Sequence, residues 1–270
     1  MDLILVGPGR AGLALSLASV GAGHRVVGVL ARDPEDAVAA AERIDASPLS
    51  WDRGLPRADL LVVAVRDDAI TEVAQRLSDK AGALEGAVHL SGLRPVAALA
   101  ALEGPPLGSF HPLQTLPTPE AGAARLRDAW VAITSSDNAF ADRLFAFAAS
   151  LGAHPFELED HAKPLYHAAA AAAANFTLAA LALSRELFEA AGVDFTVAQP
   201  LIRAVVDNAL DMGPVEALTG PVARGDVGTV RAQMEAIRSA APHLAGDFAA
   251  MVRATARVAG TAEIIEGALS

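Results

Sequence analysis

A short strand, a glycine-rich turn and a helix follow one another at the start of this chain, and this order constrains the fold most. The apolar run LILV spans residues 3–6, the turn GPGRAG comes next, and a helical pattern covers residues 11–23. Gly7 suits a tight turn, Gly9 lets a ligand approach the backbone, and Gly12 lets helix and strand pack closely. This strand–loop–helix unit predicts an α/β fold.

Strand-like and helical stretches alternate through the first part of the chain. The predicted strands lie at 3–6, 25–30, 59–65, 87–90, 130–134 and 154–158, and further helices lie at 34–44, 68–79 and 138–152. Such alternation predicts a parallel sheet with helices on both faces. Beyond it only helical patterns occur, at 160–191, 195–211, 227–238 and 242–258. We therefore expect an α/β domain over residues 1–158 and an all-α domain over residues 159–270.

Composition removes several classes of function. Apolar residues make up 53% of the 270 residues, which is enough for a sizeable core. The formal net charge is -11 and no basic stripe is visible, which argues against nucleic-acid binding. The absence of cysteine excludes disulfides, thiolate catalysis and thiolate metal sites. The seven histidines are scattered without the spacing of metal ligands, so no metal is expected.

The apolar segments do not predict a membrane protein. The first apolar run, LILVG, has five residues, which is too short for a signal peptide. The longest apolar stretch is a run of alanines interrupted by Lys163, His167 and Asn175. Alanine is only weakly hydrophobic, so this stretch is a poor membrane span. We expect a cytoplasmic protein that makes no contact with a membrane.

In its strand–loop–helix context, GPGRAG predicts a dinucleotide-binding site. The first N–H groups of the helix offer hydrogen bonds and partial positive charge to a diphosphate. The candidate contacts are Gly7, Gly9, Arg10, Ala11 and Gly12. The alternative interpretation is a glycine-rich turn in an ordinary strand–helix unit.

The end of the second strand favours NADP(H) over NAD. NAD-binding proteins usually carry an acidic residue there, whereas this chain has Ala31 and Arg32 before Asp33. A small residue followed by arginine leaves room for a 2′-phosphate and pairs with its charge, and Arg10 could assist. The alternative is that Arg32 is a solvated surface charge and Asp33 binds a ribose.

Three further stretches should lie at the carboxyl edge of the sheet, where such folds bind ligands. They are RDDAI (66–70), SGLRP (91–95) and SFHPLQT (109–115), all expected as loops. The candidate cofactor contacts there are Val65, Arg66, Ser91 and Gly92, and the candidate substrate contacts are His111 and Gln114. The alternatives are a structural role for His111 and a helix-capping role for Asp67 and Asp68.

The motifs together resemble a known family. GPGRAG, VAVRDDAI, HLSG, SFHPLQT, KPLYHAAAAAAAN and ALTGPVARGDVGTV resemble those of bacterial candidate NADP oxidoreductases. These proteins join a Rossmann-like domain to a helical C-terminal domain of unknown function, similar to the C-terminal domain of 6-phosphogluconate dehydrogenase. They are related to pyrroline-5-carboxylate reductase and to deazaflavin-linked and ketopantoate-type reductases. The chain departs from the family pattern at Arg66, where proline is common, and at Ala174, where serine is common.

The resemblance implies a cleft between the two domains. The residues it implies there are His111, Gln114, Lys163, His167, Asn175 and the loop 219–226. On a helix with about 100° per residue, Lys163, His167, Ala170 and Ala174 share one face. That bare face either borders the cleft, with Lys163 and His167 reaching substrate, or forms a close helix–helix contact.

These observations predict an NADPH-dependent reductase of a small carbonyl or imine compound, such as a keto acid or a cyclic imino acid. Lys163 or His167 would supply the proton, with Asn175 as a third candidate catalytic residue. Tyr166 and Arg224 are further candidate substrate contacts. The alternatives are a hydroxy-acid dehydrogenase, a deazaflavin-linked NADP reductase or a non-catalytic NADP-binding sensor. By analogy with the relatives, we expect a homodimer.

Overall fold

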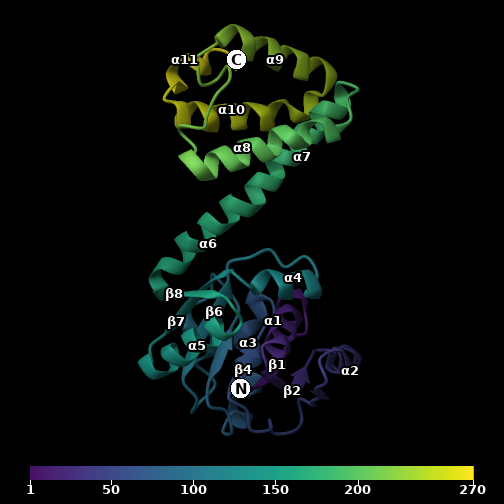
Figure 1. Ribbon diagram of the computed structural model, residues 1–270, viewed down its shortest axis with the longest axis vertical. Helices are drawn as coiled ribbons and strands as arrows, with labels where there is room; N and C mark the ends of the chain where they lie inside the picture. Colours follow the sequence, from purple (N-terminus) through teal and green to yellow (C-terminus); the bar gives the residue numbers. More distant parts are fainter. Residues whose placement is uncertain (270) are drawn as a thin grey trace. The chain divides into compact units, whose positions relative to one another are not determined.

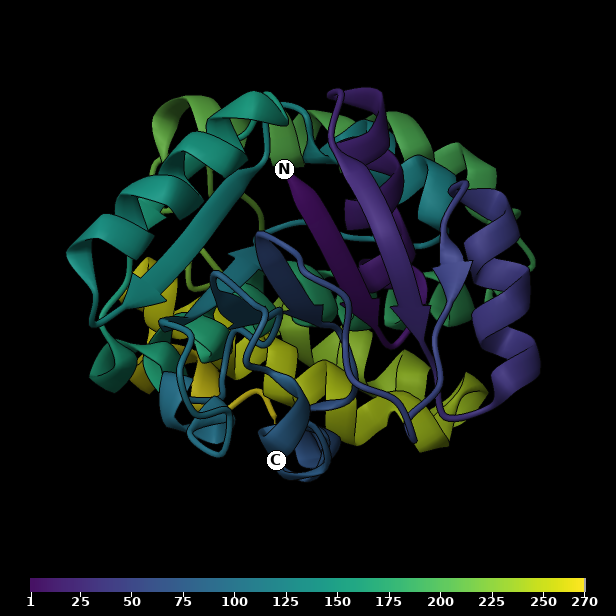
Figure 2. The same ribbon diagram turned by 90° about the horizontal axis from the view of Figure 1, so that it is seen from below.

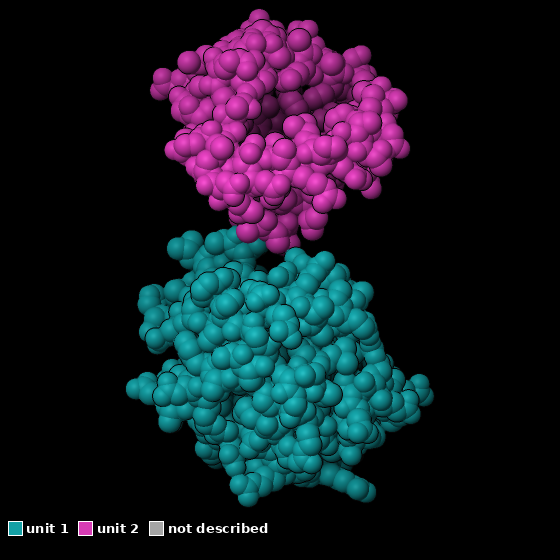
Figure 3. Space-filling model, viewed as in Figure 1, with its two compact units in different colours: residues 1–171 teal, residues 172–270 magenta. Residues whose placement is uncertain are grey.

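The chain divides into two compact units in a computed structural model that describes residues 1–269 (Figures 1 and 3). The first unit covers residues 1–171 and the second begins at residue 172. The division by packing therefore lies within the helical segment that follows the last strand. The change from alternating elements to helices alone, on which the predicted domains rest, comes earlier, after residue 158.

Eight strands form one sheet in the first unit, in the order β3-β2-β1-β4-β5-β6-β7-β8. Figure 2 shows β1 and β2 side by side in purple. The strands are β1 Asp2–Val6, β2 Arg25–Leu30, β3 Ser47–Pro48, β4 Leu60–Val63, β5 Ala87–His89, β6 Leu107–Pro112, β7 Trp130–Ser135 and β8 His154–Glu157. The chain goes outward from β1 to β3 and then returns to the other side of β1. This reversal of strand order leaves a crevice at the carboxyl ends of β1 and β4, where ligands bind in such sheets.

One pair of strands departs from the predicted parallel sheet. β7 runs antiparallel to β6, whereas every other pair in the sheet is parallel. The N–H of Leu113, just beyond β6, donates to the carbonyl of Trp130, the first residue of β7, at 2.8 Å. β7 thus begins beside the point where β6 ends, so no crossover returns the chain to the opposite edge.

The strand β6 is itself a correction to the sequence analysis. The stretch 109–115 was expected to be a loop, but Ser109, Phe110, His111 and Pro112 belong to β6. Glycine, proline and histidine have low strand propensity, so the pattern gave no strand signal here. Phe110 is fully buried between the sheet and its helices, and this burial outweighs the local preference.

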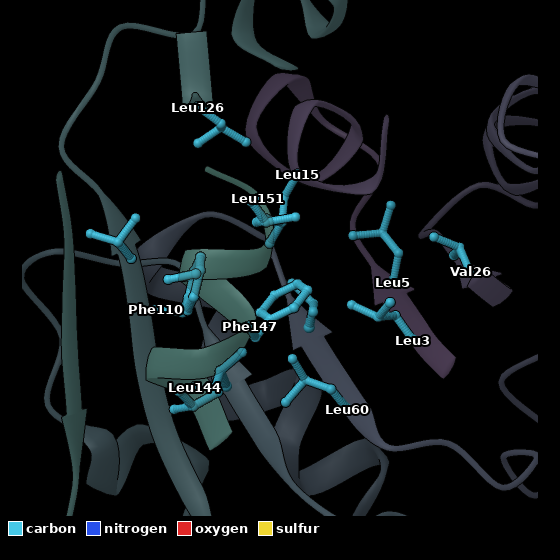
Figure 4. Packing of buried hydrophobic residues seen from close by; sticks show 14 of the residues in the cluster. Leu3, Leu5, Leu15, Val26, Leu60, Phe110, Leu126, Leu144, Phe147 and Leu151 are labelled. Atoms are coloured by element: carbon cyan, nitrogen blue, oxygen red, sulfur yellow. The ribbon is translucent and has the colours of Figure 1, made fainter. Parts of the chain in front are cut away.

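Helices cover both faces of the sheet, as predicted. The helices of this unit are α1 Arg10–Gly21, α2 Pro34–Arg43, α3 Ile70–Arg76, α4 Pro119–Leu126 and α5 Asn138–Ser150. Alternate residues of β1 serve the two faces: Leu3 and Leu5 pack with residues of α1, α4 and α5, while Ile4 and Val6 pack with α3. Figure 4 shows the first of these clusters, with Phe110 and Phe147 at its centre. Both faces of the sheet are buried, as expected for parallel strands.

The helical segment after the sheet begins with a 3₁₀ turn and is interrupted by a π-helical turn. It consists of a 3₁₀ turn at Asp160–Ala162, α6 at Lys163–Ala171, a π-helical turn at Ala172–Phe176 and α7 at Thr177–Ala190. The sequence predicted one continuous helix over 160–191. A π turn inserts extra chain into the helical repeat, so residues beyond it are rotated from the positions that a 100° period gives. Ala174 and Asn175 lie inside this turn.

The second unit has a small core and a large apolar surface. Its later helices are α8 Gln199–Met212, α9 Val227–Ala240, α10 Ala245–Ala259 and α11 Ala262–Glu266. Val230 and Met234 of α9 pack with Val252 and Ala256 of α10 and with Ile265 of α11. Neither α7 nor α8 buries a single residue within the described chain.

One helical run, Asp160–Ala190, is long and apolar enough to cross a membrane by length and composition, contrary to the weak signal read from the sequence. Its first residues are tied to the globular first unit, because Lys163 is buried there and donates to Ser109 Oγ of β6 at 2.7 Å. Length and composition alone are weak grounds for a membrane span, since a helix that packs in a globular protein meets the same criteria.

Candidate active site

The glycine turn between β1 and α1 is closely packed at two positions and open at the third. Gly7 has a φ of 89°, and a Cβ there would lie 2.8 Å from the carbonyl oxygen of Ala64. A Cβ on Gly12 would lie 2.5 Å from the carbonyl oxygen of Gly7. By contrast, a Cβ on Gly9 would meet no atom within 4 Å. Only Gly9 has space in front of it, as expected where a ligand approaches the backbone.

A pocket of about 640 Å³ adjoins this turn within the first unit. Its lining comes from the glycine turn, the end of β2, α2, the segment after β4 and α3. The predicted contacts that line it are Gly7, Gly9, Ala31, Arg32, Val65 and Arg66. Gly12 is buried beneath the turn, and Arg10 and Ala11 are not part of this lining.

The end of β2 has the arrangement on which the NADP prediction rests. Ala31 is buried and Arg32 is exposed at the pocket. Asp33 caps helix α2, because its carboxylate accepts the N–H of Glu35 at 2.9 Å. Capping commits one oxygen of this carboxylate to the helix. The alternative role for Asp33, binding a ribose, would have to use the other.

Several side chains of the pocket did not figure among the sequence candidates, and three of them can bind an anion or an aromatic ring. They are Arg43 on α2, Trp51 after β3 and Arg76 on α3. The Trp51 indole N–H donates to the carbonyl of Ala31 at 2.6 Å, and the Arg76 guanidinium lies over the Trp51 ring at 4.3 Å. Neither follows a strand end directly, so strand–loop motifs do not point to them. The scarcity of tryptophan, with two in the chain, was the one available signal.

A second group of polar side chains lies at the carboxyl ends of β4, β5 and β6. The Ser91 hydroxyl donates to Asp67 at 2.8 Å and accepts the N–H groups of Leu93 and Arg94. His89 is fully buried, with one ring nitrogen 3.2 Å from the Pro95 carbonyl and the other 3.2 Å from the N–H of Ser91. Burial lowers the pKa of His89 to about 4. These bonds fix the loop after β5.

His111 and Tyr166 form a hydrogen-bonded pair next to this loop. His111 Nδ1 lies 2.9 Å from the Tyr166 hydroxyl, and the His111 ring packs so closely on Gly92 that a Cβ there would lie 2.7 Å away. Burial lowers the pKa of His111 to about 4, with His167 as a second cause, and raises that of Tyr166 to about 12. The imidazole is therefore neutral and the phenol protonated at pH 7, and the tautomer of the imidazole decides which of the two donates.

Lys163, a predicted catalytic residue, has all three of its ammonium protons matched by acceptors. The side chain is 1% exposed. Nζ lies 3.0 Å from the Arg94 carbonyl, 2.7 Å from Ser109 Oγ and 2.9 Å from Asp160 Oδ1. Burial lowers the pKa of Lys163, and the Asp160 carboxylate opposes that effect. Asp160 also accepts the N–H of Val96, so the pair holds the loop after β5 against the first turn of α6.

The other predicted residues are distributed between the two units. His167 is exposed on α6, with its ring 6.4 Å from that of His111 between centroids. Gln114 is exposed in the first unit, and its side-chain oxygen accepts the N–H of Thr115. Asn175 and Arg224 belong to the second unit, where both are exposed. The structure thus brings His111, Tyr166 and His167 together, with Gly92 against the His111 ring.

Two family models match the chain. Residues 1–109 match a Rossmann-like domain, and residues 129–255 match a domain of unknown function, DUF2520. This is the combination of domains that the motifs indicated. The sequence matches no protein of curated function.

Three solved structures illustrate the similarity of fold. A candidate NADP oxidoreductase from Bacteroides fragilis has a TM-score of 0.77 and 26% identity over 97% of this chain and 98% of that chain. An imine reductase from Streptomyces aurantiacus has a TM-score of 0.71 and 16% identity over 100% of this chain and 98% of its own. A pyrroline carboxylate reductase from Plasmodium falciparum, solved with NADP bound, has a TM-score of 0.62 and 12% identity over 98% of each chain. At such identities the last two show the fold alone.

Proposed function

Because this chain joins a Rossmann-like domain to a DUF2520 domain, we propose that it is an NAD(P)-dependent reductase and that its cofactor is NADPH. The observation that carries the proposal is the glycine turn, closed at Gly7 and Gly12 and open at Gly9, beside a pocket of about 640 Å³. The similarity to a candidate NADP oxidoreductase over nearly the whole chain supports it.

The residues present fit the proposed cofactor. The space at Gly9 and the uncapped first turn of α1 suit a diphosphate, because no side chain occupies the N–H groups there. Arg32 offers a cation at the end of β2, where a 2′-phosphate would lie, and Asp33 is engaged as a helix cap. When bound, NADPH supplies a hydride to an electron-poor carbon.

The chain's own residues would bind the substrate and deliver the proton. His167 is the proposed proton donor, because it is exposed and lies beside the His111–Tyr166 pair. This pair would orient a carbonyl or imine group of a small keto acid or cyclic imino acid. Lys163 would act through the loop after β5, since its three acceptors hold the ammonium in place. Gln114 and Arg224 stay predicted substrate contacts, and Asn175 stays a predicted catalytic residue.

A substitution at Gly9 tests the cofactor proposal directly. Gly9→Ala adds a methyl group where the protein has free space and where φ is -72°, so the variant should keep the wild-type melting temperature. The same methyl group would obstruct a diphosphate, and we expect NADPH affinity to fall about tenfold or more. Gly21→Ala is a matched control, because that glycine ends the same helix and also faces open space.

Calorimetry measures the binding of NADPH and of NADH. A second assay then follows the oxidation of each nucleotide in the presence of a panel of keto acids and cyclic imino acids. Tighter binding of NADPH than of NADH supports the proposal if the NADPH affinity falls in Gly9→Ala and is kept in Gly21→Ala. A clear preference for NADH would contradict the NADP assignment, and failure to bind either nucleotide would overturn the cofactor site. His167→Ala should lower turnover strongly and leave NADPH affinity unchanged.

The occupied ammonium of Lys163 favours a second candidate, an NADP-binding sensor that does not consume its ligand. A lysine with all donors matched to protein acceptors is explained by structure and needs no catalytic role. The two candidates differ in one measurement. NADPH binding without consumption across the whole panel of substrates would favour the sensor.

We also propose that a second copy of the chain covers the apolar surface of the second unit. Leu201, Val205 and Leu210 of α8 are 63%, 56% and 80% exposed, and Phe176 and Leu178 are 66% and 63% exposed. Several large apolar side chains exposed together on a surface usually mark an interface. Cytoplasmic location remains a prediction from composition.

A further inference from the structure

The cofactor pocket contains more positive charge than its ion pairs neutralise. Four arginines line it, with two carboxylates, Asp36 and Glu72. Two of the arginines have partners: Arg43 pairs with Glu120, and Arg66 pairs with Asp68 at 2.8 Å. Within residues 1–269, the other two arginines, Arg32 and Arg76, lie in no ion pair. Both therefore have guanidinium donors available to a ligand.

Arg76 is placed by an aromatic ring. Its guanidinium carbon lies 4.3 Å from the centroid of the Trp51 ring, within the range of a cation–π interaction. Stacking uses the flat face of the guanidinium and leaves its N–H groups, which point outward in the plane, free to donate. The ring therefore positions the Arg76 side chain while its N–H groups stay free to bind an anion.

Trp51 is in turn fixed to the strand end that carries Arg32. Its indole N–H donates to the carbonyl of Ala31 at 2.6 Å, and its ring packs against the apolar cluster on the α3 face of the sheet. One tryptophan therefore connects the end of β2 to Arg76 on α3. The two unpaired guanidinium groups line the same pocket from two different elements.

We propose that Arg76, held on Trp51, acts together with Arg32 to select a 2′-phosphorylated adenosine over an unphosphorylated one. This rests on the proposed NADPH-dependent function and adds to it two residues, Trp51 and Arg76. A phosphate dianion suits two cations that approach from different elements, since each guanidinium can donate to different oxygens. Asp36 and Glu72 on the same lining would repel that dianion, so a single arginine is less suited to hold it.

Adenosine 2′,5′-bisphosphate and adenosine 5′-monophosphate test this without any redox chemistry, because they differ by the 2′-phosphate alone. The chain has two tryptophans, and Trp130 lies on β7 at 55% exposure, outside the pocket. In a Trp130→Phe background, fluorescence therefore reports on Trp51. We expect the bisphosphate to bind about tenfold or more tightly than the monophosphate.

Arg76→Ala should weaken bisphosphate binding about tenfold and leave monophosphate binding within about twofold of its parent. Arg32→Ala should have a similar effect. Arg57→Ala is the matched control, because it also removes one exposed arginine but lies outside the pocket, where Arg57 pairs with Glu85. It should leave the preference unchanged. Melting temperatures confirm that each variant folds.

Trp51 variants, followed by calorimetry, separate stacking from the indole hydrogen bond. Trp51→Phe keeps a ring beneath Arg76 and should keep most of the preference, whereas Trp51→Leu should reduce it. An unchanged preference in Arg76→Ala, with loss in Arg32→Ala, would overturn the role of Arg76 and leave the proposed function standing. If neither nucleotide binds the wild-type protein, the proposed function and this inference fail together.

Discussion

The two units of this protein bury their apolar residues to different extents. In the first unit, two apolar clusters occupy the two faces of the sheet, and the largest fully buried side chains come from it. In the second unit, a small core joins α9, α10 and α11, while α7 and α8 have no fully buried residue among those described. The first unit buries most of its large apolar side chains, whereas the second leaves those of α8 exposed. The proposed second copy of the chain accounts for that difference.

Charging α8 should have the largest effect on this comparison. Leu201→Glu combined with Val205→Glu places two charges on side chains that are 63% and 56% exposed in the single chain. If a second copy buries them, the double variant should be monomeric, because unpaired charges cannot be buried cheaply. Sedimentation analysis checks this, with Arg203→Glu on the same helix as the control.

Two outcomes would contradict the proposed dimer. A wild-type protein that sediments as a monomer at all concentrations would remove the need for a second copy. A protein that fractionates with membranes would indicate that lipid, rather than protein, covers the apolar helices.

Lys163→Met should have the next largest effect, and it concerns the first unit. Methionine keeps much of the volume, but Ser109, the Arg94 carbonyl and Asp160 lose the ammonium that bonds to all three. The substitution leaves the buried Ser109 hydroxyl and the Arg94 carbonyl without this donor and breaks a pair whose carboxylate is 40% exposed, at a combined cost of about 3 kcal/mol in the free energy of unfolding. Urea unfolding measures this loss. A catalytic lysine with no structural role would instead leave stability unchanged while turnover falls.

Acid should destabilise the first unit through His89. The folded-state pKa is about 4 against an ordinary 6.5, so between these values the unfolded chain binds a proton that the folded chain does not. The free energy of unfolding should therefore fall as pH drops from about 6.5 to about 4, by up to about 3 kcal/mol from this residue. Its charged neighbours are Lys163, Asp67 and Asp160.

Urea unfolding at several pH values measures that slope. His89→Gln keeps a donor and an acceptor but cannot titrate, so its stability should vary less with pH over this range. His161→Gln, on an exposed side chain, is the matched control. A slope that His89→Gln leaves unaltered would assign the acid sensitivity to another group, such as His111.

Removing one helix cap from each unit should have the smallest effect and sharpens the comparison. Asp137 accepts the N–H of Phe140 at the start of α5, and Asp226 accepts that of Thr229 at the start of α9. Each substitution to alanine should cost about 1 kcal/mol. If a second copy completes the second unit, the transition shifted by Asp226→Ala should depend on protein concentration. The transition shifted by Asp137→Ala should not depend on protein concentration. If both variants shift the same transition with the same concentration dependence, the two units unfold together.

The sequence by itself was sufficient for elements with strong patterns. Alternating apolar runs predicted β1, β2, β4 and β5, and GPGRAG predicted the turn that opens the pocket. These elements depend on local chemistry: apolar strands that are buried on both faces, and glycines at positions where a Cβ would collide. Helical patterns predicted α7, α8, α9 and α10 of the second unit, but not α11.

Tertiary structure alone decided the rest. β6 forms although its residues have low strand propensity, because neighbouring strands and helices bury Phe110. Lysine side chains usually lie at the surface, yet acceptors from β6, the loop after β5 and the turn before α6 surround the ammonium of Lys163. Trp51 and Arg76 are far apart in the chain and meet only because β3 and α3 border one pocket. Burial and pairing depend on which distant segments come together, and a one-dimensional pattern does not contain that information.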